Sequence, residues 1–179
     1  MRRLVVLSVL LLTAIPAFAQ LQNQPAPTLK SVLLSQLHST HDKSEWFVCV
    51  DVAVAGVTPE QASWTDGKGN HSVGQLTNHL LFWNRQQLAK LTGQKPEKYS
   101  GNNDETFNSF DAKRWNETVK QLDVVLTQLE SLVENADDAK LKQIAFGIEH
   151  VSAHNAYHIG QIVFVRKEQG SWDATKGVK

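Results

Sequence analysis

Cysteine is nearly absent from this chain, because Cys49 is the only one among its 179 residues. A single cysteine excludes an internal disulfide, so packing has to hold the fold together. Cys49 lies between Val48 and Val50, and we interpret it as a small buried apolar side chain. A reactive thiol and an intermolecular disulfide are the alternatives.

Net charge is absent as well, since 18 Lys and Arg residues balance 18 Asp and Glu residues. Proteins that bind nucleic acids or anionic membranes through electrostatics carry a clear basic excess. The sequence therefore predicts no nucleic-acid partner.

The chain has no apolar run of the roughly 20 residues that a membrane-spanning helix needs. The apolar residues 4–15 follow Arg2 and Arg3 and precede Pro16–Ala19. A basic start, a short apolar run and a small-x-small end are typical of a secretory signal peptide. We therefore predict an exported, periplasmic or secreted protein without a membrane anchor after cleavage, an uncleaved anchor being the alternative. Its expected parts are a signal peptide over residues 1–19, a leader over 20–27 and one domain over 28–179.

Two common catalytic motifs are also missing. The glycine-rich residues 66–70 lack the Gly-x4-Gly-Lys-Ser/Thr pattern of a phosphate-binding loop. Asn155, and not a glutamate, follows His154, so the His-Glu-x2-His pattern of zinc proteases is absent. Both of these enzyme classes are excluded.

Helical periodicity is what the sequence has instead. In several segments apolar residues recur every three or four positions, which places them on one face of a helix. Thr28 and Ser72 are suited to cap two of these helices, and Gly93 and Gly170 to end two of them. The pattern predicts an all-α protein. Long helices are expected after Thr28, from Ser72 to about Leu91, over residues 111–135 and from the turn at 136–138 to Gly170. Residues 45–55 are expected to be helical as well and to continue the bundle after the first helix.

The last helix carries three histidines four residues apart, His150, His154 and His158. Neighbours in this series can share one metal ion, whereas the outer two lie about 12 Å apart and cannot. A projection at about 100° per residue places His158 in the apolar stripe and His154 at its margin. His150 lies further round, facing a neighbouring helix or the rim of a pocket. The inward pair is therefore His154 and His158.

A third ligand is expected from a different helix, and His79 is the best candidate. It shares a helix face with Leu76 and Trp83, so it borders the core, where a neutral imidazole needs a partner. The second ring nitrogen of each ligand needs a hydrogen-bond partner too. The sequence offers four candidates without assigning any: Gln75, Asn78, Asn155 and Gln161.

The pattern around these histidines resembles the DinB-like superfamily. The similarity rests on Gly56-Val-Thr-Pro59, on His79 followed by Leu-Leu-Phe-Trp-Asn-Arg, and on His154-Asn-Ala-Tyr-His158-Ile-Gly-Gln161. The resemblance implies a four-helix bundle that holds a divalent metal ion on His79, His154 and His158. It also implies kinship with thiol-dependent transferases and hydrolases.

Two further features of the sequence have more than one interpretation. His38 and His41 are three residues apart and could bind metal, but we favour solvated polar groups at a helix end. Residues 94–109 have no apolar period and are expected to form a long loop. Such a loop can be a lid over a site or a simple connection, and Phe107 and Phe110 are its expected anchors.

Three hypotheses for function follow. The first is a metal-dependent enzyme, a hydrolase or a thiol-dependent transferase, because three histidines leave a coordination position open for water or a thiolate. The second is a bundle that binds metal or a small ligand without catalysis, and the third is a purely structural bundle. Zinc is the default metal, and nickel, iron or cobalt suit the same nitrogen ligands. Exposed apolar surface on the first and third helices would allow a homodimer.

Overall fold

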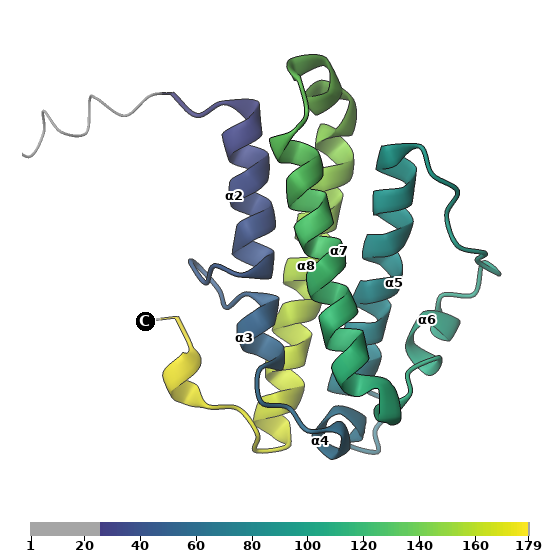
Figure 1. Ribbon diagram of the computed structural model, residues 1–179. Coiled ribbons are helices and arrows are strands. Elements are labelled where there is room, and N and C mark those ends of the chain that lie inside the picture. Colours follow the sequence, from purple (N-terminus) through teal and green to yellow (C-terminus); the bar gives the residue numbers. More distant parts are fainter. Residues whose placement is uncertain (1–25, 179) are drawn as a thin grey trace, which may run out of the picture.

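A computed structural model describes residues 26–178 of the chain, and every regular element in that range is helical. The signal peptide predicted at residues 1–19 lies outside the described residues. Four long helices form the body of the molecule (Figure 1). They are α2 (Leu29–His41), α5 (Val73–Thr92), α7 (Trp115–Glu134) and α8 (Asp138–Glu168). The short helices are α3 (Val50–Val54), α4 (Pro59–Ser63) and α6 (Asp104–Asn108), and 3₁₀ turns span Ala112–Arg114 and Ala174–Lys176.

Local sequence signals set the ends of the long helices. The Thr28 hydroxyl accepts a hydrogen bond from the Ser31 amide, and Ser72 does the same for Gln75, in two capping boxes. Gly93 ends α5 with a φ of 75°, a left-handed conformation that glycine adopts without a steric penalty. The helix starts expected at Thr28 and Ser72 and the stop at Gly93 are therefore confirmed.

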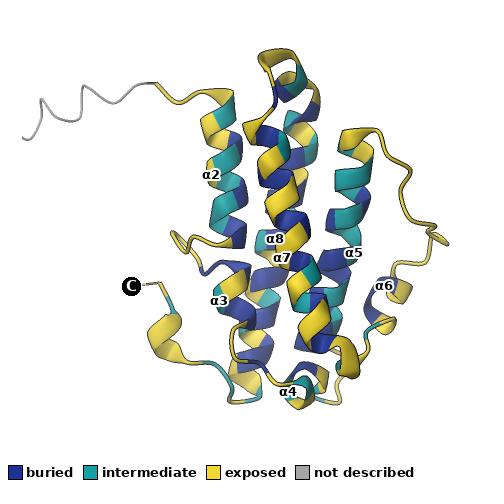
Figure 2. Cartoon of the chain, in the orientation of Figure 1, coloured by how far each residue is buried: buried dark blue, intermediate teal, exposed yellow. Residues whose placement is uncertain are grey.

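The long helices pack as a bundle in which α5 and α2 each contact both α7 and α8. Apolar residues at helical spacing point between the helices, and the residues of the outer faces are exposed (Figure 2). The four long helices and the absence of strands among residues 26–178 confirm the predicted all-α bundle. No helix among the described residues is long and apolar enough to cross a membrane.

Two expected segments differ from the structure. Residues 45–55 are helical only over Val50–Val54, and the chain is irregular over residues 43–49 between α2 and α3. Residues 94–109 are not a loop throughout, since α6 (Asp104–Asn108) forms within them. This short helix lies beside α5 (Figure 1), and Phe107 is buried there, as expected of an anchor.

The C-terminal tail folds back on the bundle. The buried Arg166 guanidinium donates to the carbonyls of Ala53 and Ser171 at 2.7 and 2.8 Å. It also lies 5.3 Å from the centre of the Trp172 ring, a cation–π contact. The expected packing of Trp172 is confirmed, and Cys49 is fully buried as predicted.

Candidate metal centre

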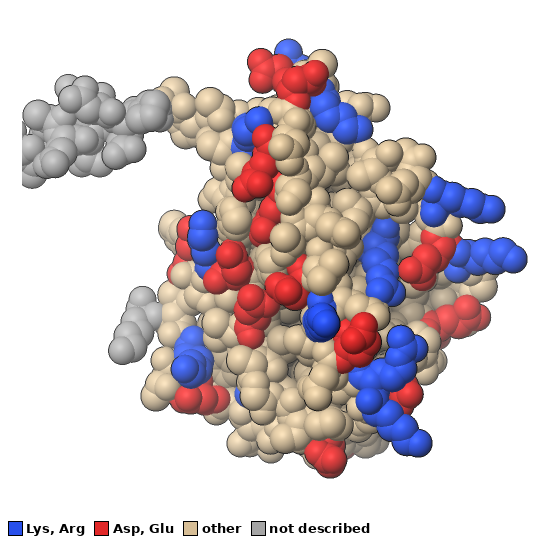
Figure 3. All heavy atoms as spheres, in the orientation of Figure 1, with Lys and Arg blue, Asp and Glu red and all other residues tan. Residues whose placement is uncertain are grey.

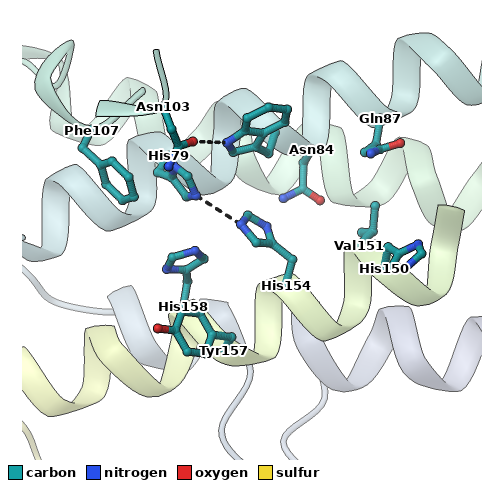
Figure 4. A pocket seen from close by; sticks show the side chains of 11 residues that line it. His79, Asn84, Gln87, Asn103, Phe107, His150, Val151, His154, Tyr157 and His158 are labelled. Carbon is teal, nitrogen blue, oxygen red and sulfur yellow. Dashed lines mark hydrogen bonds between the residues drawn. The ribbon is translucent and has the colours of Figure 1, made fainter. Parts of the chain in front are cut away.

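Three histidine side chains from two helices converge at one point between α5 and α8. His79 comes from α5, and His154 and His158 come from α8, where four-residue spacing places both on the side that faces α5. The Nε2 atoms of His79 and His154 are 3.1 Å apart, and one ligand atom from each of the three rings lies within 4.8 Å of the others. Figure 4 shows His79 and His154 pointing toward each other with His158 beside them. The set chosen from the sequence is thus brought together.

The outer nitrogens of two of these rings are held by oxygen atoms. His79 Nδ1 lies 2.6 Å from Thr106 Oγ1, and that hydroxyl donates its own hydrogen to the Asn103 carbonyl at 2.7 Å. Thr106 must therefore accept from His79, which places the proton on Nδ1 and the lone pair on Nε2. His158 Nδ1 lies 2.6 Å from Gln161 Oε1, an oxygen that can only accept, so the same tautomer follows there. Both inner nitrogens are lone-pair donors.

Burial keeps the three imidazoles neutral. It is the main cause that lowers the pKa of His79 to about 3, with smaller contributions from the neighbouring His158 and His154. Burial, followed by the proximity of His158, lowers the pKa of His154 to about 4. The pKa of His158 is lowered as well, mainly by burial, although its bond to Gln161 works in the opposite direction. A metal ion needs neutral imidazoles, and this environment supplies them.

The three histidines line a cavity of about 550 Å³. Trp83, Phe107 and Val151 give it apolar walls, while Asn103 and Gln87 add polar groups. The Phe107 ring stacks on His79 with a centroid distance of 3.9 Å, so α6 forms part of the cavity wall. A pocket of this size with few polar groups is suited to a small molecule.

Comparison with known proteins bears on this arrangement. A family model of the DinB superfamily matches residues 50–162, more than half of the chain and a span that includes all three histidines. The chain belongs to the DinB superfamily. Neither the curated proteins nor the solved structures contained a match to it. The resemblance noted in the sequence is thereby confirmed at the level of the family.

Other residues near the site in this DinB-superfamily chain have different roles. Of the four side chains considered as partners for the ligand rings, only Gln161 contacts one. Asn155 instead exchanges hydrogen bonds with Asn84, and Asn78 donates to the Thr106 carbonyl and so fixes α6 against α5. His150 lines the cavity and is exposed, which confirms its expected position at the rim.

The part of the site that sequence reasoning missed comes from α6. Thr106, which orients His79, lies 27 residues away from it. The only available signal was the length of the segment 94–109, which suggested a lid without pointing to a particular residue. Phe107 was expected to anchor this segment, but its stacking on His79 was not foreseen.

A second group of histidines and carboxylates lies between α2 and α7, where acidic side chains gather on the surface (Figure 3). His41 was expected to be solvated at a helix end, and this was wrong, because only 4% of it is exposed. Its Nδ1 lies 2.8 Å from Glu130 Oε1 and its Nε2 lies 3.0 Å from Asp123 Oδ1. His38 also contacts Glu130, at 3.3 Å.

The protonation state of His41 distinguishes this group from the triad, the three histidines His79, His154 and His158. Burial lowers its pKa, but the hydrogen bonds to Glu130 and Asp123 outweigh burial and leave the pKa raised. Carboxylates only accept, so both contacts favour the protonated ring, in which both nitrogens of His41 donate and neither has a free lone pair. We therefore interpret this group as an ion-pair network, whereas His79 and His158 of the candidate metal centre present lone pairs.

Proposed function

We propose that this DinB-superfamily chain binds one divalent metal ion through His79, His154 and His158, and that the cavity above them holds a small-molecule ligand of that ion. The observation that carries the proposal is the contact between His79 Nε2 and His154 Nε2 at 3.1 Å. His79 presents a lone pair there, and zinc–nitrogen bonds of about 2.0–2.1 Å place neighbouring ligand nitrogens at about 3.3 Å. The donor set therefore fits such an ion.

The two outer hydrogen bonds of the site also suit a metal centre. Ligating histidines usually donate their second N–H to an oxygen atom, which orients the ring and raises its basicity. Thr106 and Gln161 do this for His79 and His158. An all-nitrogen set accepts zinc, nickel, iron or cobalt, and zinc is the default.

Three protein ligands leave one coordination position open, as in catalytic zinc sites. An ion bound there would supply a Lewis acid that acidifies water or holds a thiolate. The protein itself supplies a partly apolar pocket, in which Trp83 and Phe107 limit the access of water and Asn103 offers an amide to orient a polar ligand. We propose a metal-dependent hydrolase or thiol-dependent transferase on this basis.

A non-catalytic metal- or ligand-binding protein is the second candidate. No Asp or Glu is among the residues that line the cavity, so no carboxylate is placed to act as a general base. His150 and Tyr157, both at the rim, are the remaining titratable groups there. Binding without turnover is the function that this lack of a carboxylate base favours.

Export is also part of the proposal and rests on the N-terminal residues alone. An exported protein meets few of the small thiols of the cytosol, so hydrolysis is the better match to an exported location. Mass spectrometry of the protein made with its full N-terminus in a secreting host would show a chain that starts at Gln20. A mature chain that still starts at Met1 would remove the export proposal.

Metal analysis of protein purified without a histidine tag tests the central proposal. We expect one divalent ion per chain in the wild type and in His150→Ala, and much less in His79→Ala. His150→Ala is the matched control, because it removes a histidine from the same cavity without touching the triad. Equal metal content in all three proteins, or none in the wild type after reconstitution, would refute the proposal. Screening the loaded protein against esters, amides and thiol-plus-electrophile pairs then separates an enzyme from a binding protein.

A further inference from the structure

The outward face of α8 is unusual for an exposed helix face. Large apolar side chains stand out from it, with Phe146, Tyr157 and Phe164 exposed by 80, 64 and 57%. They belong to a series with alternating steps of four and three residues, the spacing of a coiled-coil seam. We call this series the α8 seam: Phe146, His150, Ala153, Tyr157, Gly160 and Phe164, all exposed. None of its members is a Lys, Arg, Asp or Glu, and exposed apolar stripes of this kind mark interaction sites.

The seam is complementary to itself when two copies run antiparallel. Its spacing is symmetric about residue 155, so each large side chain meets a defined residue of the second helix. Tyr157 lies opposite Ala153, and His150 lies opposite Gly160, so in these central pairs a large residue meets a small one. Phe146 lies opposite Phe164, which pairs the two aromatic ends. In a parallel pair, by contrast, Tyr157 would meet Tyr157 and Gly160 would meet Gly160, which leaves clashes and gaps along the seam.

We propose that the chain forms a twofold-symmetric homodimer through antiparallel packing of the α8 seam. A twofold axis requires the same patch on both copies, and the seam meets this requirement. Aromatic side chains bury about 150–250 Å² each, so six of them, more than half exposed, would contribute on the order of 600–1,000 Å². The small residues and flanking stems between them bring the total toward the roughly 1,200 Å² at which specific interfaces begin.

The dimer would also complete the cavity. His150 and Tyr157 belong to the seam and to the cavity lining at the same time. The second copy would pack against both side chains and form an outer wall of the cavity at its rim. Dimerisation itself uses none of the three proposed metal ligands, so a metal-free chain would dimerise as well, and the two proposals can fail separately.

Sedimentation analysis of the wild-type chain and of seam variants tests the proposal. We expect a dimer at about 100 µM, where a micromolar complex is fully formed. Phe146→Glu and Phe164→Glu should be monomeric with an unchanged helical circular-dichroism spectrum, because both positions are exposed. Val124→Glu on α7 and Val32→Glu on α2 change exposed apolar residues outside the seam and should leave the dimer intact. A monomeric wild type would overturn the proposal, and so would dimers in both seam variants.

A second pair of variants tests the antiparallel register. A Cβ added to Gly160 meets no atom within 4 Å in the single chain, so Gly160→Leu should leave the fold intact while it blocks the space that His150 of the second copy needs. We expect this variant to be monomeric. A short bis-maleimide should join Ala153→Cys dimers, whose two positions are about 6 Å apart along the axis, and not Lys142→Cys dimers, about 39 Å apart. Equal crosslinking at both positions would indicate a parallel pair and refute the register.

Discussion

Replacing Thr106 by valine should weaken metal binding without disturbing the rest of the bundle. The two side chains have nearly the same shape, and Thr106 is buried on α6. The change removes the hydroxyl that accepts the Nδ1–H of His79 at 2.6 Å. His79 would lose both its orientation and its preference for the tautomer that directs the Nε2 lone pair at His154. The buried Nδ1–H of His79 would have no acceptor in the position that binds the metal. Turning the ring to find another acceptor would move Nε2 away from the metal.

The size of the effect follows from that one contact. Loss of a hydrogen bond that orients a metal ligand typically costs about 10–100-fold in metal affinity, or about 1.4–2.7 kcal/mol. A buried N–H left without a partner costs about 1–3 kcal/mol, which agrees with that range. We therefore expect the dissociation constant for Zn²⁺ to rise about 10–100-fold in Thr106→Val. Thr106→Ser, which keeps the hydroxyl, should remain within a few-fold of the wild type.

Competition with a chromophoric chelator measures these dissociation constants. Thr77→Val is the matched control, because Thr77 is equally buried on α5 but its hydroxyl donates to the Val73 carbonyl and does not touch the triad. It should leave the Zn²⁺ affinity unchanged. In the metal-free protein, long-range proton–nitrogen NMR should show His79 protonated at Nδ1 in the wild type and not in Thr106→Val. Unchanged affinity in Thr106→Val, or an equal loss in Thr77→Val, would refute the role assigned to Thr106.

Three further predictions concern stability. The raised pKa of His41 means that its ion pairs stabilise the fold fully below the ordinary value of 6.5 and lose this effect as pH rises through the folded-state pKa. Urea unfolding should therefore show a smaller loss of stability between mildly acidic and alkaline pH in Glu130→Gln than in the wild type, and equal pH dependence would contradict the network. Gly74→Ala should lower the free energy of unfolding by about 1–3 kcal/mol in urea, because the new Cβ would overlap the Phe110 ring. Asn155→Ala should cost a similar amount, about 1–3 kcal/mol, because the buried Asn84 amide would lose both hydrogen bonds to Asn155 and keep only its bond to the Leu80 carbonyl. This variant should keep full metal content, and metal loss would place Asn155 in the site.

Patterns local in sequence determined much of this molecule. The period of apolar residues determines which face of each helix is buried, because a helix rotates by a constant angle per residue. For the same reason His154 and His158 could be assigned to the inward face and His150 to the rim. The capping residues Thr28 and Ser72 act on amides three residues away, so they too can be read without knowledge of the fold. The DinB pattern added the four-helix arrangement and selected the same three histidines.

Contacts between distant segments were decided only by the tertiary structure. His41 is buried and charged because Glu130 and Asp123 reach it from α7, more than 80 residues later in the chain. Thr106 holds His79 because α6 is folded against α5. Helical periodicity says which way a side chain points from its own axis, and not which group comes to meet it. Packing brings those groups together, and packing therefore sets the tautomers, the pKa values and the cavity on which any function of this protein depends.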